Sequence, residues 1–484
     1  MKRRELRWHE TIGATLFGMI IVIAGGAIWA DETASAKDLG EILLERGVIS
    51  KEDLQQAREQ EQQEHAAQES RLDAFRAKLP KWLDVFTPFG DIRLRHEGFY
   101  QDELNARNRF RFRARVGMVA TVSDEVSGTV RLATGSSNDP ISTNQTADNT
   151  FTRKSINLDW AYVTLKPGKT LGLAPGWVTV TAGKFGVSAY RLTEMVWDDD
   201  VSPEGATETL HLVDSSAGFL RGVRVSAFQW VIDEIAAAGD PWIPGGQLVA
   251  DMAPYDGALW TVGFADYYYD RTDAVARKFL NQYNDPPANT KANSSYNGQL
   301  ANSNAVVKDA NGKIIGYRSG FNVINVGTEL SAVDPVGVGI PAGLFADFAY
   351  NTEADGRNVG LSVGAGIGKA GRDWYRNPLK KQGDWGMSYT YAWVEQDAVL
   401  SMFSFSDYNE FSTRAATAGA ARPTQKGGTN VMSHIVRVDY VLLPSVQLTA
   451  KAYIENVLDR WHSNAALTGN PTLVRTQLDA MLRF

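Results

Sequence analysis

The sequence predicts an all-β transmembrane barrel of about 16 antiparallel strands, and three observations lead to this fold class. From about residue 86 onward, apolar and polar side chains alternate along many short segments, as in strands whose two faces meet different environments. The chain ends on such a segment, with Leu478 and Leu482 on one face, Asp479 and Arg483 on the other, and the aromatic Phe484 last. Short turns alternate with long polar loops, which is the asymmetry of outer-membrane barrels.

Composition excludes several classes of protein. The 484 residues include 44 glycines, and the middle of the chain has no long uninterrupted apolar run, which argues against a helical membrane protein. The absence of cysteine excludes disulfides, c-type haem attachment and cysteine-ligated zinc. A net charge of −7 disfavours nucleic acid as a partner. These features fit an exported protein that folds without forming disulfides.

The first element is a leader of the kind that directs export. An uncharged apolar stretch, Thr11 to Ala30, follows a basic start and precedes small residues. The basic residues are Lys2, Arg3, Arg4 and Arg7. We therefore expect a signal peptide over residues 1–36, cleaved after Ala30 or after Ala36. An uncleaved inner-membrane anchor is the alternative, because the stretch is long enough to span a bilayer.

The next element, residues 37–80, is the one region with clear helical patterning. A short helix ends at Gly47, and Ser50 caps a second helix. The part of this helix from Gln60 to Glu69 has almost no apolar seam, so a coiled coil is only weakly specified. We expect a periplasmic α-helical segment, either a solvated helix or a coiled-coil stalk that associates subunits.

The barrel domain is expected over residues 86–484. Alternating segments lie near 91–95, 109–118, 130–132, 156–162, 177–186, 208–214, 218–231, 247–253, 258–269, 319–330, 342–351, 358–369, 383–396, 431–443, 446–458 and 473–484. An even number of strands brings both ends of the domain to the same side of the membrane. Residues 370–382 break the alternation of short and long connections, because they are long where a short turn is expected.

Arginines make the sharpest local pattern. They alternate with apolar residues on three neighbouring segments, as Arg93, Arg95, Arg109, Arg111, Arg113, Arg115 and Arg131. In the dry core of a soluble β-sandwich such a row would repel itself, so we expect it to face a water-filled lumen. A basic wall would favour anionic or carboxylate-bearing solutes, because guanidinium stays charged and binds carboxylate as a fork. The alternative is that the arginines pair with acidic loop residues and hold a constriction in place.

The acidic counterpart lies in the expected loop 187–207, as Asp198, Asp199, Asp200 and Glu204. If this loop folds inward, we expect its carboxylates to face the arginines and to create a transverse field across a constriction. The alternative is an external acidic loop that binds divalent cations near lipopolysaccharide. The spacing matches no recognised calcium loop, so the sequence assigns no metal site.

Six ordered segments carry a family resemblance. They are Phe89–Arg95 (FGDIRLR), Arg107–Arg115 (RNRFRFRAR), Arg131–Pro140 (RLATGSSNDP), Thr143–Thr146 (TNQT), Thr181–Lys184 (TAGK) and Trp197–Gly205 (WDDDVSPEG). Together they resemble the putative porin family of Gram-negative outer membranes, over about residues 86–484. The resemblance implies a barrel through which solutes diffuse.

Catalysis is not expected. The six histidines, at positions 9, 65, 96, 211, 434 and 462, show no metal-ligand spacing, and the chain has no Gly-x-Ser-x-Gly elbow and no phosphate loop. The sequence therefore assigns no catalytic residue and no cofactor. The alternative is that folding brings a serine next to His96, His211 or His434, as in an outer-membrane phospholipase. The aromatic residues of the chain are expected instead in girdles at the two membrane interfaces, and the alternative is that some of them point inward and stack on sugars. These are Trp160, Tyr162, Trp177, Trp230, Tyr267, Tyr268, Tyr269, Trp385, Tyr391 and Trp393.

The sequence as a whole favours an integral outer-membrane channel for passive diffusion of small hydrophilic solutes, with residues 37–80 in the periplasm. Its expected partners are outer-membrane lipid and lipopolysaccharide, the solutes themselves, anionic ones among them, and further copies of the chain in a homotrimer. Two alternatives stay open. One is an adhesin or surface-binding barrel with a plugged lumen, and the other is the barrel sheath of an electron conduit with a separate cytochrome.

Overall fold

The computed structural model describes residues 84–484, apart from 103, 149, 236–238, 281–301, 370–380, 409–410, 413–423, 426 and 460–470, together with Ser50 and Gln55. The expected signal peptide lies outside the described residues. So does the expected helical segment 37–80, except for those two positions. Among the described residues, the helices are all too short or too polar to cross a membrane.

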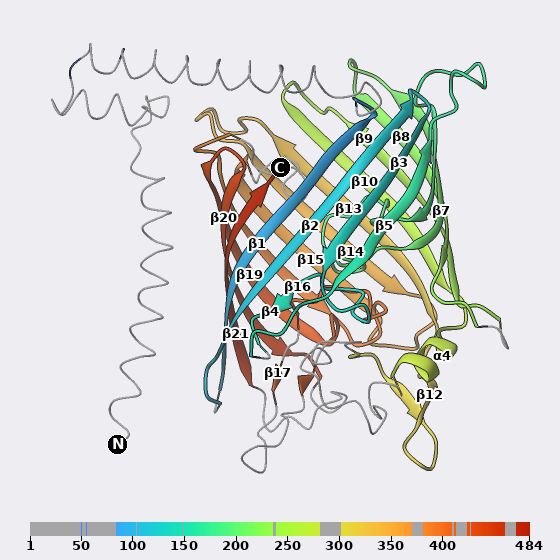
Figure 1. Ribbon diagram of the computed structural model, residues 1–484, viewed down its shortest axis with the longest axis vertical. Helices are drawn as coiled ribbons and strands as arrows, with labels where there is room; N and C mark the ends of the chain where they lie inside the picture. The colour runs from blue at the N-terminus through green and yellow to red at the C-terminus, as the bar shows by residue number, and fades with distance from the viewer. Residues whose placement is uncertain are drawn as a thin grey trace. The chain divides into compact units, whose positions relative to one another are not determined.

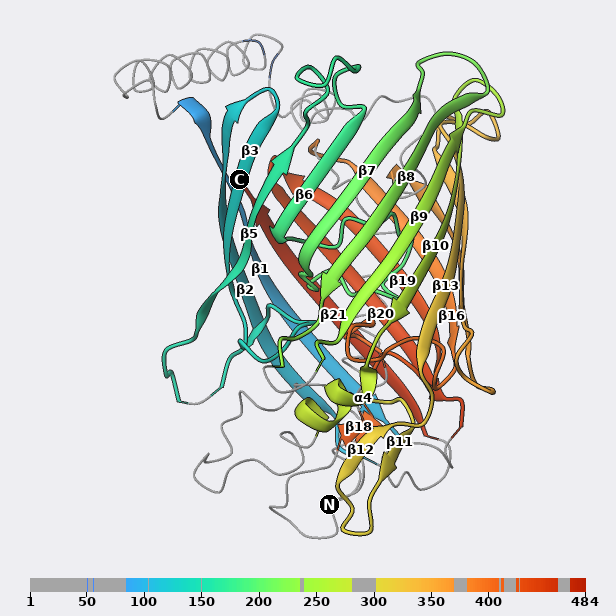
Figure 2. The same ribbon diagram turned by 90° about the vertical axis from the view of Figure 1, so that its right-hand side faces the viewer.

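One closed antiparallel sheet forms the wall of a barrel (Figure 1, Figure 2). The wall strands are β1 (Phe86–Gln101), β2 (Arg107–Ser123), β3 (Val126–Thr134), β5 (Ile156–Leu165), β6 (Val178–Lys184), β7 (Glu204–Asp214), β8 (Leu220–Val231), β9 (Trp242–Met252), β10 (Ala258–Tyr269), β13 (Phe321–Ala332), β14 (Ala342–Asn351), β15 (Val359–Gly368), β16 (Trp385–Val394), β19 (Val431–Leu443), β20 (Val446–Val457) and β21 (Thr472–Arg483). Each pairs with the next in this order, and β21 pairs back with β1, where Leu94 lies opposite Ala480.

The strand count confirms the prediction. The sheet has 17 strands, of which β4 (Gln145–Thr146) is a two-residue strand that pairs with β2 inside a loop. The remaining sixteen make the wall, and each alternating segment of the sequence corresponds to one of them. The period-two pattern therefore located the whole barrel, because successive side chains of a strand point to opposite faces that differ in surroundings.

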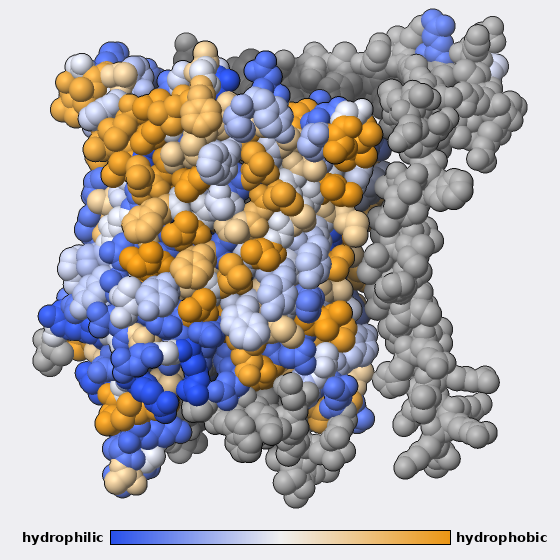
Figure 3. Space-filling view, turned by 180° about the vertical axis from the view of Figure 1, so that it is seen from behind, coloured by the Kyte–Doolittle hydropathy of each residue, from blue (hydrophilic) through white to orange (hydrophobic). Residues whose placement is uncertain are grey.

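Apolar side chains face outward and charged side chains face inward, as the alternation predicts. On β1 and β2, Leu94 is 60% exposed and Phe110 is 65% exposed, whereas Arg95 and Arg113 are 4% and 6% exposed. On the side of the barrel drawn in Figure 3, apolar side chains cover much of the wall, and hydrophilic ones gather toward the end with the long loops. This arrangement suits lipid outside and a polar interior.

The two ends of the barrel differ in their connections. The end that holds Phe86 and Phe484 has short turns, such as residues 444–445 between β19 and β20. The other end carries the long loops (Figure 2). These loops contain α4 (Thr272–Val275), the π-helix η2 (Ala276–Leu280), β11 (Val306–Lys308), β12 (Ile314–Tyr317), β17 (Phe411–Ser412) and β18 (Thr424–Gln425). The predicted exception, 370–382, lies almost entirely outside the described residues.

Two of the long loops pack an apolar core against the inner wall. Trp197, from the loop between β6 and β7, is 2% exposed, and its ring lies 5.2 Å from that of Trp230 on β8. Its ring also lies 5.7 Å from that of Phe403, which belongs to the loop between β16 and β19. Leu400 of the same loop is fully buried. The core of this barrel is thus built by loops that fold inward.

The prediction that the aromatic residues form girdles at the membrane interfaces is only partly correct. Tyr268 and Trp393 face outward, at 44% and 38% exposed. The prediction is wrong for Trp230, Tyr267 and Tyr269, which are 1%, 0% and 3% exposed in the core. Strand alternation turns these three inward, where they pack on the loops instead of lying at a membrane interface.

Candidate functional site

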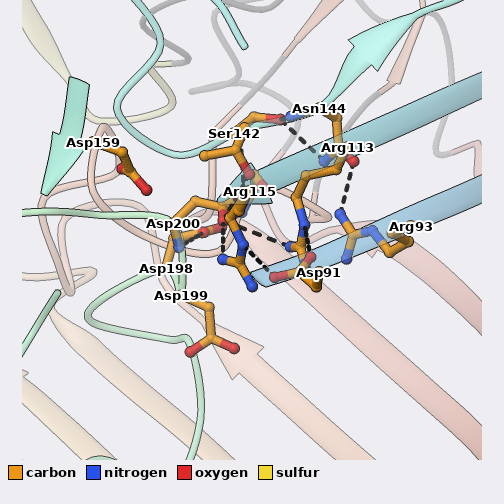
Figure 4. A network of polar contacts seen from close by, with 12 residues as sticks. Asp91, Arg93, Arg113, Arg115, Ser142, Asn144, Asp159, Asp198, Asp199 and Asp200 are labelled. Carbon is orange, nitrogen blue, oxygen red and sulfur yellow. Dashed lines mark hydrogen bonds and ion pairs between the residues drawn. The ribbon is translucent and has the colours of Figure 1, made fainter. Parts of the chain in front are cut away.

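A cluster of ion pairs lies on the inner wall of β1 and β2. Because both strands alternate, Asp91, Arg113 and Arg115 all point into the barrel (Figure 4). Arg113 Nη2 lies 2.8 Å from Asp91 Oδ1, and Arg115 Nε lies 2.7 Å from Asp91 Oδ2. One carboxylate therefore joins two guanidinium groups that would otherwise repel each other.

The loop between β6 and β7, residues 185–203, brings a second carboxylate to this cluster. Asp200 Oδ1 lies 3.5 Å from Arg115 Nη1 and 3.8 Å from Arg113 Nη1. Thr143 donates to the same carboxylate from its backbone N–H and from its hydroxyl, at 3.0 Å each. The loop thus enters the barrel and ties the arginine wall to the loop between β3 and β5.

A second cluster centres on the fully buried carboxylate of Glu97 on β1. Arg475 Nη2 lies 2.7 Å from Glu97 Oε1, and Arg95 Nη1 lies 3.6 Å from it. Glu97 Oε2 accepts a hydrogen bond from Arg109 Nε and lies 3.7 Å from Arg111 Nη1. Four guanidinium groups therefore surround one carboxylate.

Two further carboxylates complete this second cluster. Arg95 Nε lies 2.6 Å from Asp479 Oδ1 on β21. Asp407, from the loop between β16 and β19, lies 2.7 Å from Arg475 Nη2 and 3.7 Å from Arg95 Nη1. Each of the two loops that build the apolar core therefore also supplies one carboxylate to the arginine wall.

The two remaining predicted arginines differ in their partners. Arg131 Nε donates to Asp159 Oδ2 at 2.6 Å, and its guanidinium carbon lies 3.1 Å from the ring centroid of Trp160. Arg93 Nη2 donates to the amide oxygen of Asn144 at 2.7 Å, and it makes no ion pair with a carboxylate in the described part of the chain. Among the predicted arginines, Arg93 is thus the one whose positive charge is least neutralised by carboxylates.

The four predicted acidic residues do not act as one group. Asp200 alone joins the arginines. Asp198, 2% exposed, accepts a hydrogen bond from the backbone N–H of Ser406 at 2.8 Å, so it ties the two inward loops together. Asp199 forms its ion pair within its own loop, with Arg191.

Glu204 lies apart from the arginines. It is the first residue of β7, and its Oε1 lies 2.8 Å from Lys184 Nζ at the end of β6. The side chain of Glu204 is 65% exposed. The sequence placed it with the loop acids because the loop was expected to extend to residue 207.

Burial and arginine contacts move the pKa values of the loop carboxyls in opposite directions. Burial by itself raises the pKa of Asp200, but the nearby Arg113 and Arg115 outweigh it and hold the pKa below its ordinary value. Burial, with repulsion from Asp199, raises the pKa of Glu194 to about 8. At neutral pH the inward loop therefore presents a carboxylate at Asp200 and a protonated carboxyl at Glu194.

A cavity of about 570 Å³ lies beside the ion pairs. Its lining includes Lys184, the last residue of β6, and Asn157 and Asp159 of β5. Further polar lining residues are Ser136, Ser137, Asn138 and Ser202, and the apolar lining residues include Trp197 and Phe403. The cavity offers hydrogen bonds and apolar contact to a small solute, but its charged groups already hold partners.

The carboxylates on the wall itself were not among the residues predicted from the sequence. Asp91 and Glu97 lie at odd-numbered positions of β1, as Arg93 and Arg95 do, so alternation alone predicts that they point inward with the arginines. Asp407 and Arg475 had no such signal, since their contact depends on how a long loop folds. Among the described residues, no group of histidine and carboxylate side chains is arranged to hold a metal ion.

A family model described as putative porin matches residues 99–484. No curated protein matches the chain. Similar solved structures include OprB of Pseudomonas putida at high pH, with 12% identity, 84% of this chain and 96% of that chain covered, and a TM-score of 0.47. OmpF of Salmonella typhi in complex with daunomycin shows 9% identity, 82% and 97% coverage, and a TM-score of 0.42. OmpT of Vibrio cholerae, in a trimer form, shows 9% identity, 83% and 100% coverage, and a TM-score of 0.41.

Proposed function

The chain belongs to the putative porin family, and from that premise we propose that it forms a water-filled channel for small hydrophilic solutes across the outer membrane of a Gram-negative bacterium. Passage would be passive, because a barrel with a polar interior needs no energy source to let solutes move down a gradient. Residues 1–36 would be removed as a signal peptide, and residues 37–80 would lie in the periplasm. The chain would assemble as a homotrimer within outer-membrane lipid and lipopolysaccharide.

We further propose that the channel prefers anions, and the charge balance within the arginine clusters supports this. Eight arginines take part in the clusters described above, namely Arg93, Arg95, Arg109, Arg111, Arg113, Arg115, Arg131 and Arg475. They face six carboxylates, those of Asp91, Glu97, Asp159, Asp200, Asp407 and Asp479. The excess of two positive charges, with Arg93 bound only to an amide, would attract permeating anions.

The test is the reversal potential of single channels in a salt gradient across a planar bilayer. Anion preference moves the reversal potential from zero toward the equilibrium potential of the anion. Replacing Arg93 by Gln should move it toward zero, since this removes the least neutralised charge of the wall. Replacing Lys154 by Gln is the matched control, because this lysine pairs with Asp148 and not with a carboxylate of the clusters. A cation preference in the unaltered protein would reject the proposal.

A surface-binding barrel with a plugged lumen is the second candidate, and the loop core supports it. Trp197, Leu400 and Phe403 fill part of the interior near the loop end with apolar side chains. If this core closes the channel, bilayers with inserted protein should show no steady open-channel current. A steady ohmic current in each inserted protein would instead reject the plugged barrel and leave the porin.

A further inference from the structure

Lys451 is a cation of the inner wall that belongs to neither ion-pair cluster. It lies on β20 between the buried Thr449 and Tyr453, so alternation turns its side chain into the barrel. The residue is half-buried, and it forms no ion pair and no hydrogen bond with another residue in the described part of the chain. Its ammonium group therefore has three N–H donors without an acceptor from the protein.

The carboxylates around Lys451 already hold other cations. Asp407 and Asp439 lie near enough to interact with it electrostatically. Asp407, however, lies 2.7 Å from Arg475 Nη2. Asp439 accepts hydrogen bonds from Nε and Nη2 of Arg437, at 2.6 Å and 3.0 Å. The charge of Lys451 is thus left without a carboxylate in direct contact.

Lys451 lines a small cavity together with polar side chains of two neighbouring strands. Arg437 of β19 lies opposite Lys451, and Ser388 of β16 lies opposite Arg437, so the three residues form a row across the wall. Thr390, two positions along β16, also lines the cavity. Within the described residues, the hydroxyls of Ser388 and Thr390 form no hydrogen bond. The cavity is therefore bordered by an ammonium and two hydroxyls whose donors are unused.

The size of the cavity limits what it can hold. Its volume is about 30 Å³. One water molecule needs about 10–15 Å³ of such space, so a small ion fits but a sugar or an amino acid does not. Glu194, from the loop between β6 and β7, and Phe405 and Tyr408, from the loop between β16 and β19, line it as well. The two inward loops thus enclose the space against the wall, where electrostatic attraction is stronger than in open water.

The charges around the cavity favour a bound anion. Its lining contains two cations, Lys451 and Arg437, and two acidic residues, Glu194 and Asp439. Burial, with repulsion from Asp199, raises the pKa of Glu194 to about 8, so this carboxyl is uncharged at neutral pH. One positive charge therefore remains in excess beside the unused hydroxyls.

We propose that Lys451, together with the hydroxyls of Ser388 and Thr390, binds a small monovalent anion on its way through the channel. Chloride and formate represent the two sources of such an anion, an inorganic ion and a carboxylate. Both accept hydrogen bonds from ammonium and hydroxyl groups, whereas a doubly charged anion would be repelled more strongly by Asp439. This inference rests on the proposed anion preference and adds a site for it outside the arginine clusters.

Bromide is the probe that locates the site, because its anomalous scattering identifies it in crystals of the whole protein. We expect a bromide within hydrogen-bond distance of Lys451 Nζ and Ser388 Oγ, and its loss in Lys451→Gln. The matched control is Lys369→Gln, because this lysine pairs with Asp384 at 2.9 Å and is half-exposed. The control should keep the bromide. Crystals of the unaltered protein with no bromide at Lys451 would overturn the site, whether or not the channel conducts.

Single-channel conductance at rising salt concentration tests whether the bound anion lies on the pathway. Lys451→Gln should lower the conductance at about 0.1 M KCl by about twofold or more, because the site concentrates the anion at low salt. Lys451→Arg, which keeps the charge, should retain most of it, and so should Lys369→Gln. Folding of each variant is followed by the shift of the heated against the unheated barrel on a gel.

The choice of anion separates a bound ion from a general effect of charge. Potassium formate should show the same dependence on Lys451 as KCl, whereas potassium gluconate should not, because gluconate is too large for the cavity. An equal loss in gluconate, or an unchanged conductance of Lys451→Gln in KCl, would overturn the proposal. If the unaltered protein carries no current, the porin is rejected, and the bromide position still decides whether the site exists.

Discussion

Arg475 on the last strand and Glu97 on the first strand form a buried ion pair across the seam where the barrel closes, with Arg475 Nη2 2.7 Å from Glu97 Oε1. The backbone register at this seam is set by the β1–β21 pairing, in which Phe99 lies opposite Arg475. The ion pair therefore adds a charged contact between side chains to the ladder of backbone hydrogen bonds that joins the first strand to the last.

Glu97→Gln should weaken the barrel more than a typical substitution on its wall. It leaves Arg475, Arg95, Arg109 and Arg111 without their shared carboxylate, and breaking a buried pair costs about 3–5 kcal/mol. Urea unfolding of the detergent-folded protein measures the decrease in the free energy of unfolding. The double variant Glu97→Gln/Arg475→Gln should lose less than the sum of the single variants, because they share one interaction. Additive losses would show that the two residues act independently.

Asp200→Asn should increase the anion preference of the channel. The substitution removes the loop carboxylate from Arg113 and Arg115 but keeps an oxygen that can accept from Thr143. Reversal potentials against the unaltered protein measure the change. Glu204→Gln is the matched control, because its partner is Lys184 and its side chain is exposed. An equal shift in both variants would mean that the position of Asp200 within the arginine wall is irrelevant.

The pH dependence should separate Glu194 from Asp200. Burial, with repulsion from Asp199, raises the pKa of Glu194 to about 8, so this carboxyl is protonated when the protein is folded at pH 7. Its contribution to stability is present at low pH and is lost as pH rises from the ordinary glutamate value toward 8. Asp200, whose pKa is lowered, contributes stability above its ordinary value that is lost only in acid.

Ionisation of Glu194 also adds a negative charge to the inward loop, so anion preference should fall between pH 7 and pH 9. Reversal potentials across that range measure this step, and Glu194→Gln should abolish it. Persistence of the same step in Glu194→Gln would assign it to another group.

Trp197→Ala should loosen the two inward loops. The ring packs on Trp230 and Phe403, and removing a buried tryptophan side chain costs about 3–5 kcal/mol. We expect a larger and noisier single-channel conductance, because the loop 185–203 loses its anchor while the wall strands keep their pairing. Trp393→Ala is the control, because this tryptophan faces outward and is 38% exposed. An unchanged conductance in Trp197→Ala would mean that the core does not limit the channel.

The strands of the barrel wall could be predicted almost completely from the sequence, but the side-chain contacts in the interior only in part. The strands were predicted because successive side chains point to opposite faces, and the inward direction of Arg93 and Arg113 followed directly. The residues of a loop follow no regular alternation, so the contact of Asp407 with Arg475 could not be predicted from the sequence. Trp230 and Tyr267 were misplaced because an aromatic residue suits both a membrane interface and a buried core, and only its parity relative to neighbours decides.

The reversal potential of single channels in a tenfold KCl gradient shows whether the arginine clusters line an open pathway that favours anions. We expect a steady current that reverses on the chloride side of zero, and a smaller reversal potential in Arg93→Gln. A current that reverses on the potassium side of zero, or the absence of any steady current from correctly folded protein, would contradict it.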